Sequence, residues 1–132
     1  MAKTCGCACN QAPTLIFACS GSADVGELAD RAARKLDKDG IGHMYCLAGV
    51  GGRVSGIMKS TEGAVAILAI DGCPLNCAKN CLEQANFKDY YHVRVADLGF
   101  AKGETKVSDE SIGMVANKGY ELLKEIFGEL IP

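Results

Sequence analysis

The sequence lacks both an excess of charge and a long hydrophobic run. Its 132 residues include 14 basic and 16 acidic side chains, which leaves a formal net charge of −2. We therefore expect no nucleic acid partner, because binding nucleic acid requires a basic face that neutralises phosphates. The longest apolar run, Ala64 to Ile70, is far too short to span a bilayer. Neither a nucleic acid nor a membrane is expected among the partners of this chain.

The first residues also lack the pattern of an export signal. Met1 to Cys5 contain no apolar segment and no small-residue cleavage site, so we expect a cytoplasmic protein. In a reducing cytosol, cysteines serve as metal ligands, redox groups or packed side chains rather than as disulfides. The chain has 8 cysteines, its one unusual compositional feature, and a disulfide framework is the less favoured interpretation of them.

Familiar catalytic motifs are absent from the sequence. Cys19 follows a predicted strand, but Val25 stands where the phosphate loop of small tyrosine phosphatases and arsenate reductases needs an arginine. The loop from Gly49 lacks the third glycine of a dinucleotide-binding fingerprint. Cys73 and Cys77 are separated by three residues, whereas a thioredoxin motif has two between its cysteines. The sequence therefore leaves open whether the protein is an enzyme.

Hydrophobic periodicity predicts an α/β fold. The sequence predicts strands at 15–18, 44–47, 64–70 and 91–96, and the first of them is a wholly apolar run, typical of a strand buried on both faces. Apolar residues at helical spacing lie between and after these strands, at about 24–39, 53–60, 74–86 and 112–130. Strands that alternate with helices favour Rossmann-like βαβ units, and hence a three-layer fold with a four-stranded, mostly parallel sheet flanked by helices. We expect a flexible cysteine-rich head at 1–13 and a single domain at 14–132.

Local signals predict where two of the helices begin. Asp24, with Glu27 three residues later, resembles a capping box. Pro74 suits the first position of a helix, because its fixed backbone angle is already helical. We therefore expect Cys73 next to a helix N-terminus, where the helix dipole favours a thiolate.

Three evenly spaced cysteines follow three of the predicted strands. They are Cys19, Cys46 and Cys73. The carboxyl ends of parallel strands share one edge of a sheet, where open α/β proteins bind ligands, so these thiols are expected to meet. Cys77 lies one helical turn after Cys73 and on the same helix face. Four thiols are the ligand set of a closed zinc site, so the sequence predicts one zinc ion there. Packed apolar cysteines are the plainer alternative.

Several polar residues lie near this predicted edge. Asp71 and Ser20 are expected to orient the ligands as hydrogen-bonding partners. His43 and His92 border or lie in predicted strands, where a histidine is more often structural than ligating. Asp97 follows the fourth strand and could reach the same edge, although the capping of a loop explains it equally well.

The segments around the four cysteines resemble one known family. They are Cys19-Ser20-Gly21, Cys46-Leu47-Ala48-Gly49-Val50-Gly51, and Ile70-Asp71-Gly72-Cys73-Pro74 with Cys77-Ala78-Lys79. These motifs are similar to those of the DGC-domain family, which is named after its Asp-Gly-Cys motif. The resemblance covers roughly residues 15–124 and implies a zinc-binding protein with the same four cysteines as ligands. It implies no established activity.

The remaining cysteines lie outside that resemblance. Cys5, Cys7 and Cys9 alternate along the head, which could hold a second soft metal ion, donate a ligand to the main site, or bind no metal. Cys81 lies one turn beyond Cys77 and is more typical of the core than of a ligand. If Cys81 is a ligand together with the other four, an iron–sulfur cluster is favoured.

The sequence thus supports functions of different classes. The first is a small cytoplasmic zinc-binding protein that senses, delivers or is stabilised by its metal. The second is a thiol or redox enzyme in which Cys73 attacks a substrate or a disulfide and Cys77 resolves the product. A zinc ion with three cysteines and a water would instead activate that water. A metal ion is the expected partner, and the sequence does not identify a protein partner.

Overall fold

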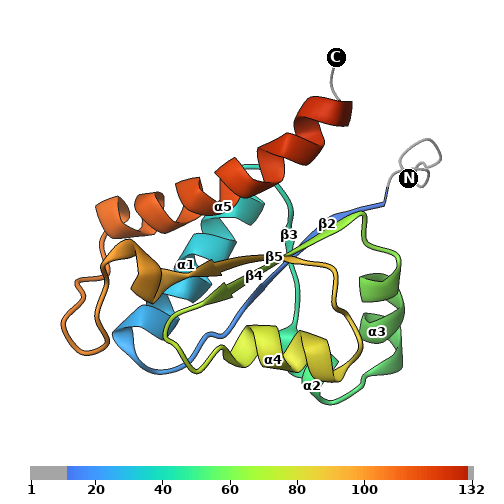
Figure 1. Ribbon diagram of the computed structural model, residues 1–132, viewed down its shortest axis with the longest axis horizontal. Helices are drawn as coiled ribbons and strands as arrows, with labels where there is room; N and C mark the ends of the chain where they lie inside the picture. The colour runs from blue at the N-terminus through green and yellow to red at the C-terminus, as the bar shows by residue number, and fades with distance from the viewer. Residues whose placement is uncertain (1–11, 131–132) are drawn as a thin grey trace.

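A four-stranded parallel sheet lies at the centre of the protein (Figure 1). The computed structural model describes residues 12–130, and their side chains as far as residue 126. The strands are β2 (Thr14–Ala18), β3 (His43–Met44), β4 (Ala66–Asp71) and β5 (Tyr91–Arg94). Their order across the sheet is β3-β2-β4-β5, and each neighbouring pair is parallel. The predicted parallel sheet is confirmed.

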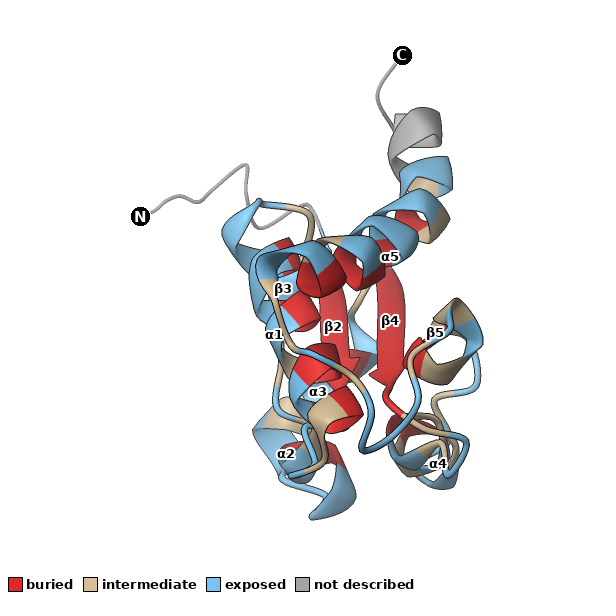
Figure 2. Ribbon diagram, turned by 90° about the vertical axis from the view of Figure 1, so that its left-hand side faces the viewer, coloured by how far each residue is buried: buried red, intermediate tan, exposed pale blue. Residues whose placement is uncertain are grey.

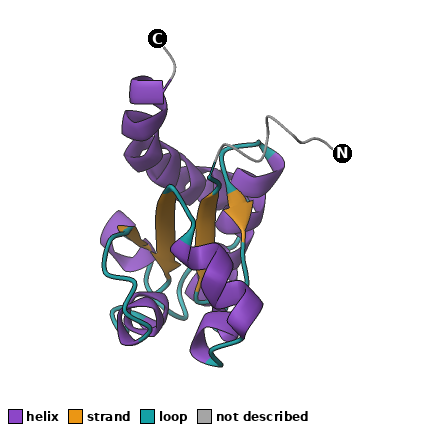
Figure 3. Ribbon diagram, turned by 90° about the vertical axis from the view of Figure 1, so that its right-hand side faces the viewer, coloured by secondary structure: helices purple, strands orange, loops and turns teal. Residues whose placement is uncertain are grey.

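Helices cover both faces of this sheet (Figures 1 and 3). They are α1 (Asp24–Lys38), α2 (Leu47–Gly51), α3 (Ser55–Glu62), α4 (Cys77–Gln84), the 3-10 helix η2 (Val95–Leu98) and α5 (Asp109–Leu130). Helices α1 and α5 pack together on one face, and α2 and α4 pack together on the other. The predicted three-layer α/β fold is confirmed. Within the described residues, we find no helix with the length and hydrophobicity needed to cross a membrane.

The two central strands are buried on both faces (Figure 2). Successive side chains of a strand point to opposite faces of the sheet. In β2, Ile16 and Ala18 therefore join the apolar cluster beneath α1 and α5, whereas Leu15 and Phe17 join the cluster beneath α2 and α4. This double burial explains why β2 and β4 are continuous apolar runs in the sequence.

The second strand is shorter than its apolar run predicts. β3 contains two residues, His43 and Met44, and forms one edge of the sheet. The carboxylate of Asp37 accepts a hydrogen bond of 2.8 Å from the backbone N–H of Met44. Leu47 belongs to α2 instead, where it packs against the cluster beneath that helix. The strand predicted at 44–47 therefore extends too far along the chain, because its last apolar residue belongs to a helix.

One of the two predicted helix starts is wrong, and at the other the helix begins as predicted but without the capping box. Helix α4 begins at Cys77, three residues after Pro74, because Asn76 takes a left-handed backbone conformation with a φ of 56°. Cys77, rather than Cys73, is consequently the first residue of the helix. Helix α1 begins at Asp24 itself, and its N-cap residue makes no side-chain hydrogen bond. Smaller shifts affect the strand predicted at 91–96, which ends at Arg94, and the helix predicted at 112–130, which begins at Asp109.

Candidate metal centre

The chain reverses its winding across the sheet beside β2. From β2 it passes through α1 to β3 on one side, and then through α2 and α3 to β4 on the other side. Open α/β sheets bind ligands at such a reversal, beyond the carboxyl ends of the strands. Cys19 follows β2 directly, and Cys73 lies two residues after the end of β4. Two of the predicted ligands therefore lie at this point.

Three of the four predicted ligands line a single cavity. Cys19, Cys73 and Cys77 contribute to its wall, and its volume is about 210 Å³. Cys19 and Cys73 are half-buried residues, whereas Cys77 is an exposed residue. The rest of the wall comes from the loop between β2 and α1, from the beginning of α1, from the loop between β4 and α4, and from Lys102. Cys19, Cys73 and Cys77 thus share one cavity at the carboxyl edge of the sheet.

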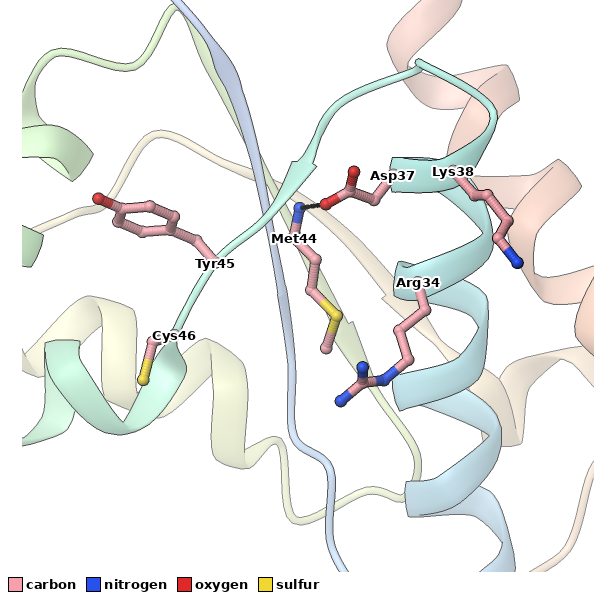
Figure 4. A pocket seen from close by; sticks show the side chains of 6 residues that line it. All are labelled: Arg34, Asp37, Lys38, Met44, Tyr45 and Cys46. Atoms are coloured by element: carbon pink, nitrogen blue, oxygen red, sulfur yellow. Dashed lines mark hydrogen bonds between the residues drawn. The ribbon is translucent and has the colours of Figure 1, made fainter.

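Cys46 lies outside this cavity. It lines a separate cavity of about 710 Å³ between α1 and the start of α2, together with Arg34 and Tyr45 (Figure 4). Its Sγ accepts a hydrogen bond of 3.3 Å from the backbone N–H of Gly49, which caps α2. Among residues 12–130, no three His, Cys, Asp or Glu side chains are close enough to one another to hold a metal ion. The predicted four-thiol set is therefore not assembled around one point.

Asp71 fixes the helix that carries Cys77. Its side chain is fully buried and accepts hydrogen bonds from the backbone N–H of Ala78, at 2.6 Å, and of Lys79, at 3.0 Å. These amides belong to the first turn of α4, where N–H groups have no partner within the helix. The second carboxylate oxygen also lies 2.8 Å from Nε2 of His92. Asp71 thus orients the helix backbone rather than a cysteine sulfur.

Gly72 joins Cys19 to the start of α1. Its backbone N–H donates a hydrogen bond of 3.3 Å to Sγ of Cys19. A Cβ atom at this position would lie 2.6 Å from the backbone carbon and oxygen of Val25 and 2.9 Å from the nitrogen of Gly26. The close approach of these two backbones therefore requires glycine. In the motif, Asp71 thus supports the helix that carries Cys77, and Gly72 supports the thiol of Cys19.

The loop after η2 brings a positive charge to the cavity. Lys102 lines the cavity, and Asp24 holds its loop by accepting hydrogen bonds of 2.9 Å from the backbone N–H groups of Gly103 and Thr105. These hydrogen bonds lower the pKa of Asp24 below its ordinary value of 3.8. The loop thus adds a cationic side chain to the wall that the three cysteines share.

We expect this loop to detach at acid pH. Because the folded protein lowers the pKa of Asp24, the attachment is complete above pH 3.8 and is lost as the pH falls through the lower, folded value. In NMR spectra, the amide signals of Gly103 and Thr105 should therefore shift together with a midpoint below pH 3.8. Asp24→Asn should abolish this transition, and Asp97→Asn should preserve it. A midpoint at or above the ordinary value would contradict the attachment.

The other candidate residues have structural roles. Cys81 lies between α2 and α4 with its Sγ 3.8 Å from the carbonyl oxygen of Leu47, and burial raises the pKa of its thiol. That environment favours a packed thiol over a ligand. Ser20 donates its hydroxyl hydrogen bond to the carbonyl of Ala18. Asp97 pairs with Arg94 at the protein surface, and His43 is exposed on the edge strand. The head cysteines, Cys5, Cys7 and Cys9, lie outside the described residues.

Comparison with known proteins agrees with the motifs of this cavity. A family model described as the DGC domain matches residues 15–118. A curated protein of Pseudomonas aeruginosa, "Anaerobic and virulence modulator AnvM", is 39% identical over 88 residues, which cover 67% of each chain. No solved structure shows a significant match. The resemblance predicted from the sequence is confirmed, and the chain belongs to the DGC-domain family.

Proposed function

We propose that this protein binds one zinc ion at the carboxyl edge of its sheet. Cys19, Cys73 and Cys77 supply three ligands, and Cys46 supplies the fourth. The observation that carries the proposal is the shared cavity, because it gathers three thiols that follow two different strands and begin a helix. Thiolate sulfur is the commonest ligand of structural zinc, and four thiolates complete its tetrahedral coordination.

The surroundings of the thiols suit a metal ligand set. The Sγ atoms of Cys19 and Cys46 each accept a backbone N–H, and Cys77 is the first residue of α4. Donors of this kind stabilise the deprotonated sulfur that metal binding requires. Cys46 follows β3, the neighbour of β2, so its backbone lies at the correct edge. Ligation requires its side chain to leave the separate cavity that it now lines.

A sensing or regulatory role fits this site. The Pseudomonas aeruginosa relative is named a modulator, and Cys77 is an exposed residue, so solvent reaches this end of the site. The five cysteines of the described residues are all free thiols. We assign this role to the cytoplasm, because a reducing compartment keeps such thiols available as metal ligands.

A thiol redox reaction is the second candidate, favoured by the exposure of Cys77 beside Cys73 in one cavity. Because Cys77, and not Cys73, begins the helix, Cys77 takes the role of the attacking thiol and Cys73 that of the resolving thiol, the reverse of what the sequence predicts. The Cys77 thiolate would attack a substrate disulfide and release one substrate thiolate. The Cys73 thiolate would then attack Sγ of Cys77 and release the second, which leaves the substrate reduced and a disulfide between the two cysteines.

The metal content of untagged, anaerobically purified protein tests the proposal. We expect about one zinc ion per chain, as a closed four-ligand site requires, and less than about a tenth of that in Cys73→Ser. Cys81→Ser is the matched control, because this thiol lies in the same helix as Cys77 but packs between helices, and it should retain the metal. Cys46→Ser distinguishes two possible ligand sets. The variant loses zinc if all four thiols are ligands, and it retains zinc if three thiols and a water hold the ion.

Other outcomes would replace the proposal. Bound iron with visible absorbance would indicate an iron–sulfur cluster. A second zinc ion that remains in Cys73→Ser would belong to Cys5, Cys7 and Cys9. Metal-free protein that forms a disulfide between Cys73 and Cys77 on oxidation would establish the redox candidate and exclude zinc.

A further inference from the structure

A buried hydrogen-bond network connects β5 to the helix that carries Cys77. Nε2 of His92 lies 2.8 Å from Oδ2 of Asp71, and the carboxylate is fully buried, whereas the imidazole is 22% exposed. Because a carboxylate only accepts hydrogen bonds, Nε2 carries the shared hydrogen. The same Asp71 side chain holds the amides of Ala78 and Lys79 in the first turn of α4. His92 is therefore two hydrogen bonds away from the backbone next to Cys77.

A second contact of this network holds the far end of the same helix. The ring of Tyr90 packs edge-on against His92, with 6.3 Å between ring centroids. The phenol hydroxyl of Tyr90 donates a hydrogen bond to Glu83, near the end of α4. Burial, together with this hydrogen bond, raises the pKa of Tyr90 to about 12, so the phenol remains a donor at neutral pH. Asp71 and Tyr90 thus hold α4 at its two ends, and His92 contacts both of these residues.

The imidazole matters because Asp71 is buried. Among the described side chains, only that of His92 forms a hydrogen bond with the carboxylate of Asp71. A buried carboxylate that loses this side-chain donor is held by fewer hydrogen bonds, and the loss of a buried partner is costly. Oδ2 of Asp71, which accepts both His92 and the amide of Lys79, would then be less firmly placed against the helix. The first turn of α4 would then open more often, and the position of Cys77 would be less well defined.

We propose that His92 is a positioning residue for Cys77, which it places by holding Asp71 against the first turn of α4. Its effect on zinc rests on the proposed function, but its effect on the helix does not. Loss of a hydrogen bond in the shell behind a metal ligand typically weakens metal affinity by 10- to 100-fold. His92 should therefore influence metal affinity without touching the metal.

Three variants test this inference. His92→Phe keeps an aromatic ring against Tyr90 but lacks a ring N–H, whereas His92→Gln keeps an N–H donor. His43→Phe is the control, since His43 is exposed at the opposite edge of the sheet. The measurements are hydrogen exchange at the amides of Ala78 and Lys79 in metal-free protein, and the zinc dissociation constant from competition with a coloured chelator.

In His92→Phe, we expect both amides to exchange about 10-fold faster relative to those of α1, and the zinc dissociation constant to rise about 10-fold. His92→Gln should restore both values to within about threefold of wild type, because it supplies the missing donor. Unchanged exchange in His92→Phe would overturn the inference, whether or not the protein binds zinc. Absence of zinc from the wild type would overturn the proposed function alone. If His92→Phe does not fold, His92→Met takes its place, because methionine also lacks a donor and adapts to irregular spaces.

Discussion

Replacing Asp71 by alanine should lower the free energy of unfolding by about 3–5 kcal/mol. The substitution removes the acceptor of two backbone N–H groups in α4 and the partner of His92, all in a fully buried position. Domains of this size are stable by only about 5–15 kcal/mol, so the variant should be close to unfolding at room temperature. Urea titration followed by far-UV circular dichroism measures the change.

The surface of the same region supplies the control for this measurement. Asp97 pairs with Arg94 at 3.1 Å, but its side chain is 62% exposed, and Asp97→Ala should therefore cost less than about 0.5 kcal/mol. Asp71→Asn keeps the shape and one acceptor oxygen of the side chain, so its cost should lie between the two alanine variants. Equal stability of Asp71→Ala and Asp97→Ala would show that Asp71 does not fix α4.

Replacing Gly72 by alanine should cost about 3 kcal/mol, the upper end of the range for overpacked sites. The new Cβ atom would meet backbone atoms of Val25 at 2.6 Å, and a backbone cannot rotate away as a long side chain can. The loop and α1 must then separate, which also pulls the amide of residue 72 away from Sγ of Cys19. The urea midpoint should fall accordingly.

Gly113 provides a matched control, because alanine at this position should raise the stability instead of lowering it. It lies within α5, and a Cβ atom there would meet no other atom within 4 Å. Alanine is the better helix former, so Gly113→Ala should raise stability by about 0.5–1 kcal/mol. If Gly72→Ala also proved neutral or stabilising, the tight contact between the loop and α1 would be refuted.

The sequence predicts the central strands well because their burial is symmetrical. β2 and β4 pack against helices on both faces, so each appears as an unbroken apolar run that ends close to a cysteine. Since both strands are parallel and adjacent, their ends define the edge where Cys19 and Cys73 lie. Local composition and one topological rule are sufficient for this part of the site.

The helix starts depend on conformations that periodicity does not encode. Pro74 is compatible with a helix, but the left-handed turn at Asn76 delays the start of α4 and transfers the helix N-terminus from Cys73 to Cys77. Cys46 likewise lies at the predicted strand end, yet its thiol caps α2 and lines another cavity. In both cases, the backbone beyond the strand decides where the side chain lies.

The loop that carries Lys102 could not be found from local patterns. Its attachment joins Asp24 to Gly103, which are 79 positions apart in the chain. Neither residue belongs to a recognisable motif with the other, and Lys102 resembles any other surface lysine in the sequence. Contacts of this kind become visible only when α1 and the loop are placed side by side.

The position of β2 in the sheet has a consequence for biosynthesis. β2 is the first strand in the described chain, but both of its neighbours, β3 and β4, are translated after it. The hydrogen bond between Gly72 and Cys19 spans 53 positions and cannot form until that length of chain has emerged from the ribosome. During synthesis the thiols are therefore separate and uncovered. Cys19 and Cys73 reach the same edge of the sheet only when β4 docks beside β2, and β5 is added beyond β4 after that.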